Sequence, residues 1–146
     1  MASTSGLAAF MAIVSRTNTS KPMKLIQESV CFKGFENTDR YKILLSHLPI
    51  AWLRNDGLEE WDIDCVFSGH LHGGQVILPG IGGVYAPDMG WFPGRLEGVF
   101  DSEDGKRHLV LSAGLGNTEV VPRFNNIPEI VCVDLVPEVK RMQSTE

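Results

Sequence analysis

Three histidines stand where two apolar segments of the chain end. His47 follows the segment YKILLS, and His70 follows DCVFS after a single glycine, with His72 two residues further on. If the two segments are neighbouring parallel strands, their carboxyl ends meet at one edge of the sheet, where open α/β sheets bind ligands. Neutral imidazole is a favoured ligand for zinc, manganese and iron ions. The placement therefore predicts a metal site formed by His47, His70 and His72.

Other residues near these histidines are candidates for contacting a substrate. Gly73 has no side chain to crowd a substrate oxygen beside His72. Asp88, in YAPDMGW, either reaches the site or caps a turn, and its Pro-Asp context favours the turn. Arg123 either clamps a phosphate oxygen or makes a turn or surface contact. We take Gly73, Asp88 and Arg123 as candidate substrate-binding residues, whereas His108 lies inside an expected strand and is predicted to be structural.

The elements that must position His47 and His70 form a strand–crossover–strand pattern. Apolar runs predict strands over 41–46 and 64–68. Between them, 51–61 has apolar residues on one face of an irregular helix that is broken near an Asn-Asp-Gly sequence. The connection is long enough for a parallel crossover, so we expect a βαβ unit and an α/β (α+β) fold.

The rest of the chain has a loop and an antiparallel part. Residues 69–98 contain nine of the fifteen glycines and are predicted to be a long irregular loop with a short strand at 75–78. The segments 96–100 and 108–112 flank a DSEDG turn and are predicted to pair as a hairpin. The apolar run at 130–136 is predicted to form a last strand. The expected sheet is therefore mixed, with a C-terminal antiparallel portion.

Composition limits the classes of protein to consider. The 146 residues carry 13 basic and 18 acidic side chains, a net charge of −5 without a basic block, which argues against a nucleic-acid binder. The three cysteines, Cys31, Cys65 and Cys132, are widely spaced and predict no disulfide framework. Cys65 and Cys132 lie in apolar runs and are predicted to be buried thiols, which indicates a reducing compartment. The longest apolar stretch, within a poorly specified arm at 1–23, is too short to span a bilayer.

The sequence DCVFSGHLHGGQVILPG, preceded by ILLSHLP, resembles the calcineurin-like metallophosphoesterase family. YAPDMGWFPG and GLGNTEVVPRFNNIPEIVCVDL further resemble the bacterial branch of that family known as predicted phosphohydrolases, so the resemblance extends from Tyr41 to Leu135. It implies a four-layer αββα sandwich that hydrolyses a small-molecule phosphoester with two divalent ions (Mn, Fe or Zn). It also implies that His47 and His70 bind one ion and His72 the other.

The N-terminal motifs of that family, D-x-H, G-D-x-x-D and G-N-H-[DE], do not occur in this sequence. Two ions need carboxylates to balance their charge, and the catalytic residues of the family are not identified here. We therefore interpret 24–136 as a C-terminal part of the domain, followed by a polar tail at 137–146.

Two readings of function remain open. One is a hydrolase whose site is completed by other residues, and the alternative is a non-catalytic, truncated or degenerate relative that binds at most one ion, for which three histidines suffice. An uncovered apolar face would favour self-association or pairing with a missing N-terminal half. The predicted location is cytoplasmic or membrane-associated.

Overall fold

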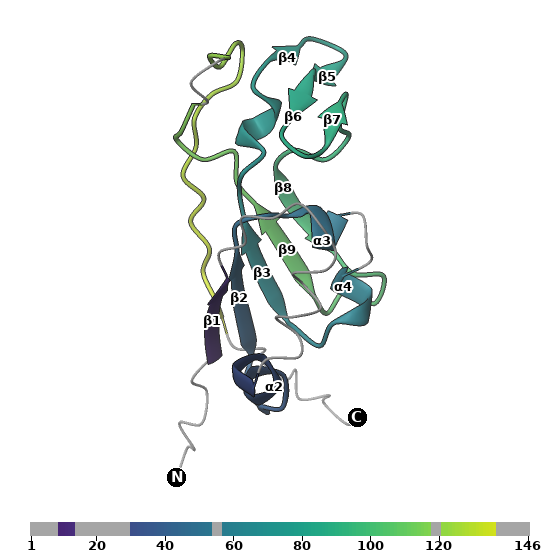
Figure 1. The fold of residues 1–146 in the computed structure, drawn as a ribbon, viewed down its shortest axis with the longest axis vertical. Helices are drawn as coiled ribbons and strands as arrows, with labels where there is room; N and C mark the ends of the chain where they lie inside the picture. The colour runs from purple at the N-terminus through teal and green to yellow at the C-terminus, as the bar shows by residue number, and fades with distance from the viewer. Residues whose placement is uncertain (1–8, 14–29, 54–56, 118–120, 137–146) are drawn as a thin grey trace, which may run out of the picture.

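The computed structural model describes residues 9–13, 30–53, 57–117 and 121–136. Its centre is a five-stranded mixed sheet in the order β1-β2-β3-β9-β8 (Figure 1). The first four strands in this order are parallel, and β8 is antiparallel to β9. The strands are β1 (Ala9–Ile13), β2 (Lys42–Ser46), β3 (Cys65–Ser68), β8 (Gly98–Asp101) and β9 (His108–Leu111). The predicted βαβ unit and hairpin are both confirmed.

Short helices and hairpins surround this sheet. Helices α3 (Ile50–Leu53) and α4 (Gly57–Glu60) lie in the crossover between β2 and β3, and α2 (Val30–Glu36) lies near the end of the sheet where β2 begins (Figure 1). Beyond the other end come the 3-10 turn η1 (His72–Gly74) and four two-residue strands, paired as two hairpins. These are β4 (Ile77–Leu78), β5 (Gly82–Gly83), β6 (Tyr85–Ala86) and β7 (Gly90–Trp91).

The main core lies on one face of the sheet. Leu44, Val66 and Leu109, which pair across β2, β3 and β9, are fully buried and pack with Trp52 and Leu58 from the crossover helices. Because alternate residues of a strand point to opposite faces, this one row of side chains anchors three strands to the helices. The core therefore fixes β2 and β3 side by side.

The opposite face of the sheet is only partly covered. Ile43, Cys65 and Val110 are buried there, but Leu45 is 45% exposed and Val99 is 60% exposed. Burial raises the pKa of the Cys65 thiol to about 11, with a further contribution from the carboxylate of Asp64. Cys65 is thus a protonated core thiol, as the sequence predicts, and plays no part in the chemistry described below. The same prediction is wrong for Cys132, which is exposed because its segment does not join the sheet.

Two segments differ from expectation. Residues 9–13, placed in the N-terminal arm by the sequence, form β1 and pair in parallel with β2. The strand predicted over 130–136 is wrong: this segment carries no strand hydrogen bonds, and Ile130 and Val136 are 75% and 79% exposed. A strand needs a neighbour in register, and none of the described strands pairs with this one. Self-association or pairing with a missing half stays a prediction.

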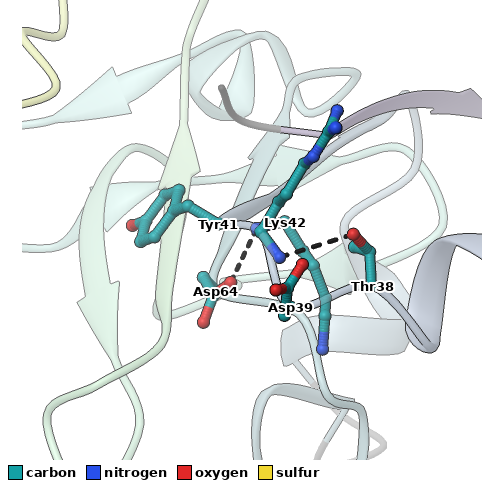
Figure 2. A pocket seen from close by; sticks show the side chains of 6 residues that line it. Thr38, Asp39, Tyr41, Lys42 and Asp64 are labelled. Atoms are coloured by element: carbon teal, nitrogen blue, oxygen red, sulfur yellow. Dashed lines mark hydrogen bonds between the residues drawn. The ribbon is translucent and has the colours of Figure 1, made fainter. Parts of the chain in front are cut away.

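A polar pocket of about 300 Å³ lies at the amino ends of β2 and β3, away from the histidines (Figure 2). In it, the Lys42 backbone N–H donates to Asp64 Oδ2 at 2.6 Å, and the Lys42 ammonium pairs with Asp62. Asp64 and Lys42 are thereby engaged in joining the starts of the two strands. Separately, no helix among the described residues is long and apolar enough to cross a bilayer.

Candidate metal centre

The sheet brings His47 and His70 into contact. Ser46 of β2 pairs with Ser68 of β3, so the segments that follow the two strands leave the sheet side by side. Beyond them, His47 Nε2 lies 3.1 Å from His70 Nδ1, and the two rings meet edge-on with centroids 4.8 Å apart. The Ser68 hydroxyl donates to the His47 carbonyl oxygen at 3.3 Å, which ties the two strand ends together. The predicted convergence of these two histidines is confirmed.

His72 lies beside this pair and is held by a different loop. Its ring centroid is 6.5 Å from that of His70. His72 Nδ1 is 3.2 Å from the carbonyl oxygen of Gly116, in the loop after β9. A carbonyl can only accept, so Nδ1 carries the proton and the lone pair is on Nε2. This hydrogen bond is the kind that orients a metal-binding imidazole from behind.

The backbone at the histidines is in an uncommon conformation. His70 and His72 have φ angles of 73° and 50°, in the left-handed region that non-glycine residues seldom adopt. Such conformations cost of order 1–3 kcal/mol and cluster at functional sites. Here they turn the chain sharply after β3 so that both rings lie at the carboxyl edge of the sheet.

The surroundings of His47 favour its neutral form. Partial burial lowers the pKa of His47, and the neighbouring His70 and His72 lower it further. A neutral ring keeps a lone pair available on one nitrogen, which is the form that binds a metal.

Asp88 also reaches this cluster. It lies in the turn between β6 and β7, and its Oδ2 is 2.9 Å from His70 Nε2. The two readings of Asp88 are therefore both realised, since the residue belongs to a turn and its side chain contacts a site histidine. Its predicted role in binding substrate stays a prediction.

Arg123 joins its own segment to the loop after β9. Its guanidinium donates to the backbone oxygens of Ala113, Gly114 and Gly116 and to Asn126 Oδ1. The structure thus shows the turn contact that the sequence left open, and phosphate binding by Arg123 stays a prediction. Asn126 is buried and donates from Nδ2 to the His72 carbonyl oxygen at 2.7 Å.

Gly73 is a buried contact point of the same framework. Its φ is +61°, and a Cβ there would lie 2.8 Å from Asn126 Oδ1 and 3.0 Å from Ala113 Cβ. Glycine is therefore required at this position by backbone conformation and by space. A substrate contact of Gly73 stays a prediction.

Replacing Gly73 by alanine is expected to lower the free energy of unfolding by about 2 kcal/mol, about half from backbone strain and half from overlap. Gly114 is the matched control, because its φ is +65° but nothing lies within 4 Å of a Cβ there. Gly114→Ala should cost about 1 kcal/mol, from strain alone. Urea unfolding followed by circular dichroism measures both. Equal losses would show that the packing against Asn126 is not the cause.

The histidine pair fits a shared ion, whereas a complete ligand set is not present. Two imidazole nitrogens bound to one ion at about 2.0–2.1 Å are separated by about 2.9–3.4 Å, and the observed separation of His47 Nε2 and His70 Nδ1 is 3.1 Å. Within the described residues, however, no group of three or more His, Cys, Asp or Glu is placed to hold a metal ion. The described residues thus place two imidazole nitrogens at the spacing of two ligands of one ion, without the further ligands that such an ion needs.

Sequence reasoning missed Gly116 and Asn126 as parts of this site. Both act through groups that carry no motif: a backbone carbonyl in one case, and a buried amide in a turn in the other. Asn126 lies in the sequence Asn-Asn-Ile-Pro, which is typical of a turn but does not indicate what its side chain contacts.

Comparison with known proteins gives a partial relationship. The chain is 35% identical over 95 residues to a protein of Bacillus subtilis (strain 168) named "Uncharacterized metallophosphoesterase YkuE". The chain is similar to a metallophosphoesterase. The matched segment is 65% of this chain and 31% of the relative, so the chain spans about a third of that protein's length. No family model matches the chain, and no solved structure matches it significantly.

Proposed function

We propose that this chain carries the histidine ligands of a metal-dependent phosphoester hydrolase. The observation that carries the proposal is the 3.1 Å approach of His47 Nε2 to His70 Nδ1 at the carboxyl ends of two paired strands. The similarity to a metallophosphoesterase supports the reaction class. The G-H-L-H-G-G-Q motif and the position of His72 beside His70 support a calcineurin-like site.

The proposed fold is part of a four-layer αββα sandwich. The helices pack on the face formed by Leu44, Val66 and Leu109, which accounts for one sheet and one helical layer. The opposite face leaves Leu45 and Val99 partly exposed. We propose that this face packs on a second sheet, supplied by residues other than those described here.

The chemistry follows from the ligands. Two divalent ions (Mn, Fe or Zn) would polarise the phosphoryl oxygens and lower the pKa of a bound water to supply a hydroxide nucleophile. His47 and His70 would hold one ion and His72 the other. The carbonyl of Gly116 and the carboxylate of Asp88 fix two of these rings from behind. Carboxylate ligands to balance the charge would come from outside the described residues.

The alternative function is a non-catalytic relative that binds at most one ion. The observation that favours it is that no described group of three or more ligand residues is placed to hold a metal. In this alternative, His47, His70 and His72 alone would hold the single ion, as three histidines do in mononuclear zinc sites.

Manganese binding and phosphoester hydrolysis test the proposal. The full chain is titrated with Mn²⁺ by calorimetry and assayed with p-nitrophenyl and bis-p-nitrophenyl phosphate. We compare a His70→Ala, His72→Ala double variant and a His108→Ala control, since His108 pairs with Asp101 on β8 and β9 and is outside the cluster. The double variant should lose more than about 100-fold in Mn²⁺ affinity, because even outer-shell changes typically cost 10–100-fold.

The outcomes separate the two readings. Hydrolysis that is lost in the double variant and kept in His108→Ala supports the hydrolase. One ion per chain without hydrolysis supports the non-catalytic relative. Absence of Mn²⁺ binding by the unsubstituted chain, repeated with Zn²⁺, would overturn both.

A further inference from the structure

The contact between Asp88 and His70 joins a turn to a ligand histidine. Asp88 Oδ2 lies 2.9 Å from His70 Nε2, and the side chains are 26% and 22% exposed. A carboxylate accepts and does not donate, so with a neutral ring the proton is on His70 Nε2. The lone pair of His70 is then on Nδ1, which is the atom that faces His47 Nε2 at 3.1 Å. The carboxylate therefore selects the tautomer in which His70 can bind an ion next to His47.

The turn tolerates an aspartate at this position but does not require one. The backbone N–H of Met89 donates to the carbonyl oxygen of Ala86 at 3.2 Å, which closes a β-turn with Pro87 second and Asp88 third. The φ of Asp88 is 62°, and a positive φ at the third position of such a turn favours glycine or asparagine. Aspartate at this position is strained relative to glycine, and its carboxylate contacts His70.

The turn is held firmly against the histidine segment. Ala86 is fully buried and shares a core cluster with Leu71 and Leu111, and Met89 packs against the same cluster. Leu71 stands between His70 and His72 in the sequence, so the cluster fixes the position of Asp88 relative to both rings. A carboxylate on a mobile loop would not orient an imidazole in this way.

We propose that Asp88 is a positioning residue that holds His70 in the metal-binding tautomer and orientation. The expected effect on metal affinity rests on the proposed function. The Asp88–His70 hydrogen bond itself is testable without any ion. This role requires no contact of Asp88 with substrate or ion. Asp88 acts through the ring of His70, as carboxylates behind metal-binding histidines do.

The test uses Asp88→Gly and Asp88→Asn in the full chain. Both residues tolerate the positive φ, so the turn is preserved and the free energy of unfolding should be unchanged or, for glycine, slightly higher. The first readout is the ring ¹⁵N spectrum of the ion-free chain at pH 8, which reports the tautomer of His70. Unsubstituted chain should show the Nε2–H form, and Asp88→Gly a mixture of the two tautomers.

The second readout is Mn²⁺ affinity by calorimetry. Asp88→Gly should bind Mn²⁺ 10–100-fold more weakly than the unsubstituted chain, and Asp88→Asn should lose less, because its amide oxygen still accepts from Nε2–H. Asp101→Asn is the matched control: Asp101 makes the same kind of contact with His108, at 2.7 Å, outside the cluster. It should change neither the His70 spectrum nor the affinity.

The failures of the two proposals are distinguishable. An Asp88→Gly chain with an unchanged His70 spectrum overturns the positioning role whatever the chain binds. So does a changed spectrum with unchanged Mn²⁺ affinity. If the unsubstituted chain binds no ion, the proposed function is overturned. A changed His70 spectrum in Asp88→Gly would then still show that Asp88 orients the His70 ring, but its role in metal binding would be overturned.

Discussion

Replacing Leu109 by alanine is expected to lower the free energy of unfolding by about 2–5 kcal/mol. Leu109 is fully buried at the centre of β9, in register with Val66 of β3, and belongs to the cluster that packs the crossover helices on the sheet. Removing its side chain takes away buried apolar surface and leaves a cavity between elements that cannot collapse without moving the sheet. For a domain with a typical stability of about 5–15 kcal/mol, this is a large fraction.

Leu45→Ala is the matched control for this prediction. Leu45 is also a strand leucine, but it lies on the other face of the sheet and is 45% exposed. Its truncation should cost about 1 kcal/mol or less, because much of its surface is already in contact with water. Urea unfolding by circular dichroism gives both values. Similar losses for the two leucines would contradict the assignment of the main core to the helix-covered face.

Arg123→Ala is expected to lower the free energy of unfolding by about 2–3 kcal/mol. The guanidinium donates to the carbonyl oxygens of Ala113, Gly114 and Gly116 and to Asn126 Oδ1. Its removal takes the donor away from Asn126 Oδ1 and the Ala113 carbonyl, both on buried residues, whereas the Gly114 and Gly116 carbonyls still accept from the Glu129 N–H and from His72. The Gly116 carbonyl also accepts from His72, so the loss should extend to the histidine cluster.

Arg123→Lys should recover less than half of that stability, because a single ammonium cannot replace a planar group that donates in several directions. Arg40→Ala is the control, because Arg40 is exposed and lies just before the start of β2, away from the histidines. Its truncation should change the free energy of unfolding by less than about 0.5 kcal/mol. Thermal and urea unfolding give the stabilities, and calorimetry gives the affinity for inorganic phosphate. An Arg123→Ala chain of unchanged stability that loses phosphate binding would favour a substrate-binding role instead.

Sequence alone determined the pair of histidines at the sheet edge. Two apolar runs of strand length, joined by a crossover of sufficient length, predict neighbouring parallel strands, and the residues after such strands must meet. The hairpin of β8 and β9 was equally accessible, because its turn residues lie between its two strands. In both cases the sequence pattern that predicts the pairing lies in the two strands and in the one segment that connects them.

Tertiary structure decided the contacts that complete the site. Asp88 follows His70 by 18 residues, and only the packing of Ala86 against Leu71 and Leu111 brings its carboxylate to the ring. The role of Arg123 depends on backbone carbonyls of another loop, which no side-chain motif records.

The two ends of the described chain show the same limit for strands. The apolar run at 130–136 has strand-like composition but no strand hydrogen bonds, whereas 9–13, inside the longest apolar stretch of the sequence, forms the edge strand beside β2. Side-chain pattern sets which residues favour an extended backbone. A strand also requires a neighbour with free N–H and C=O groups, and only the folded chain determines which segment finds one.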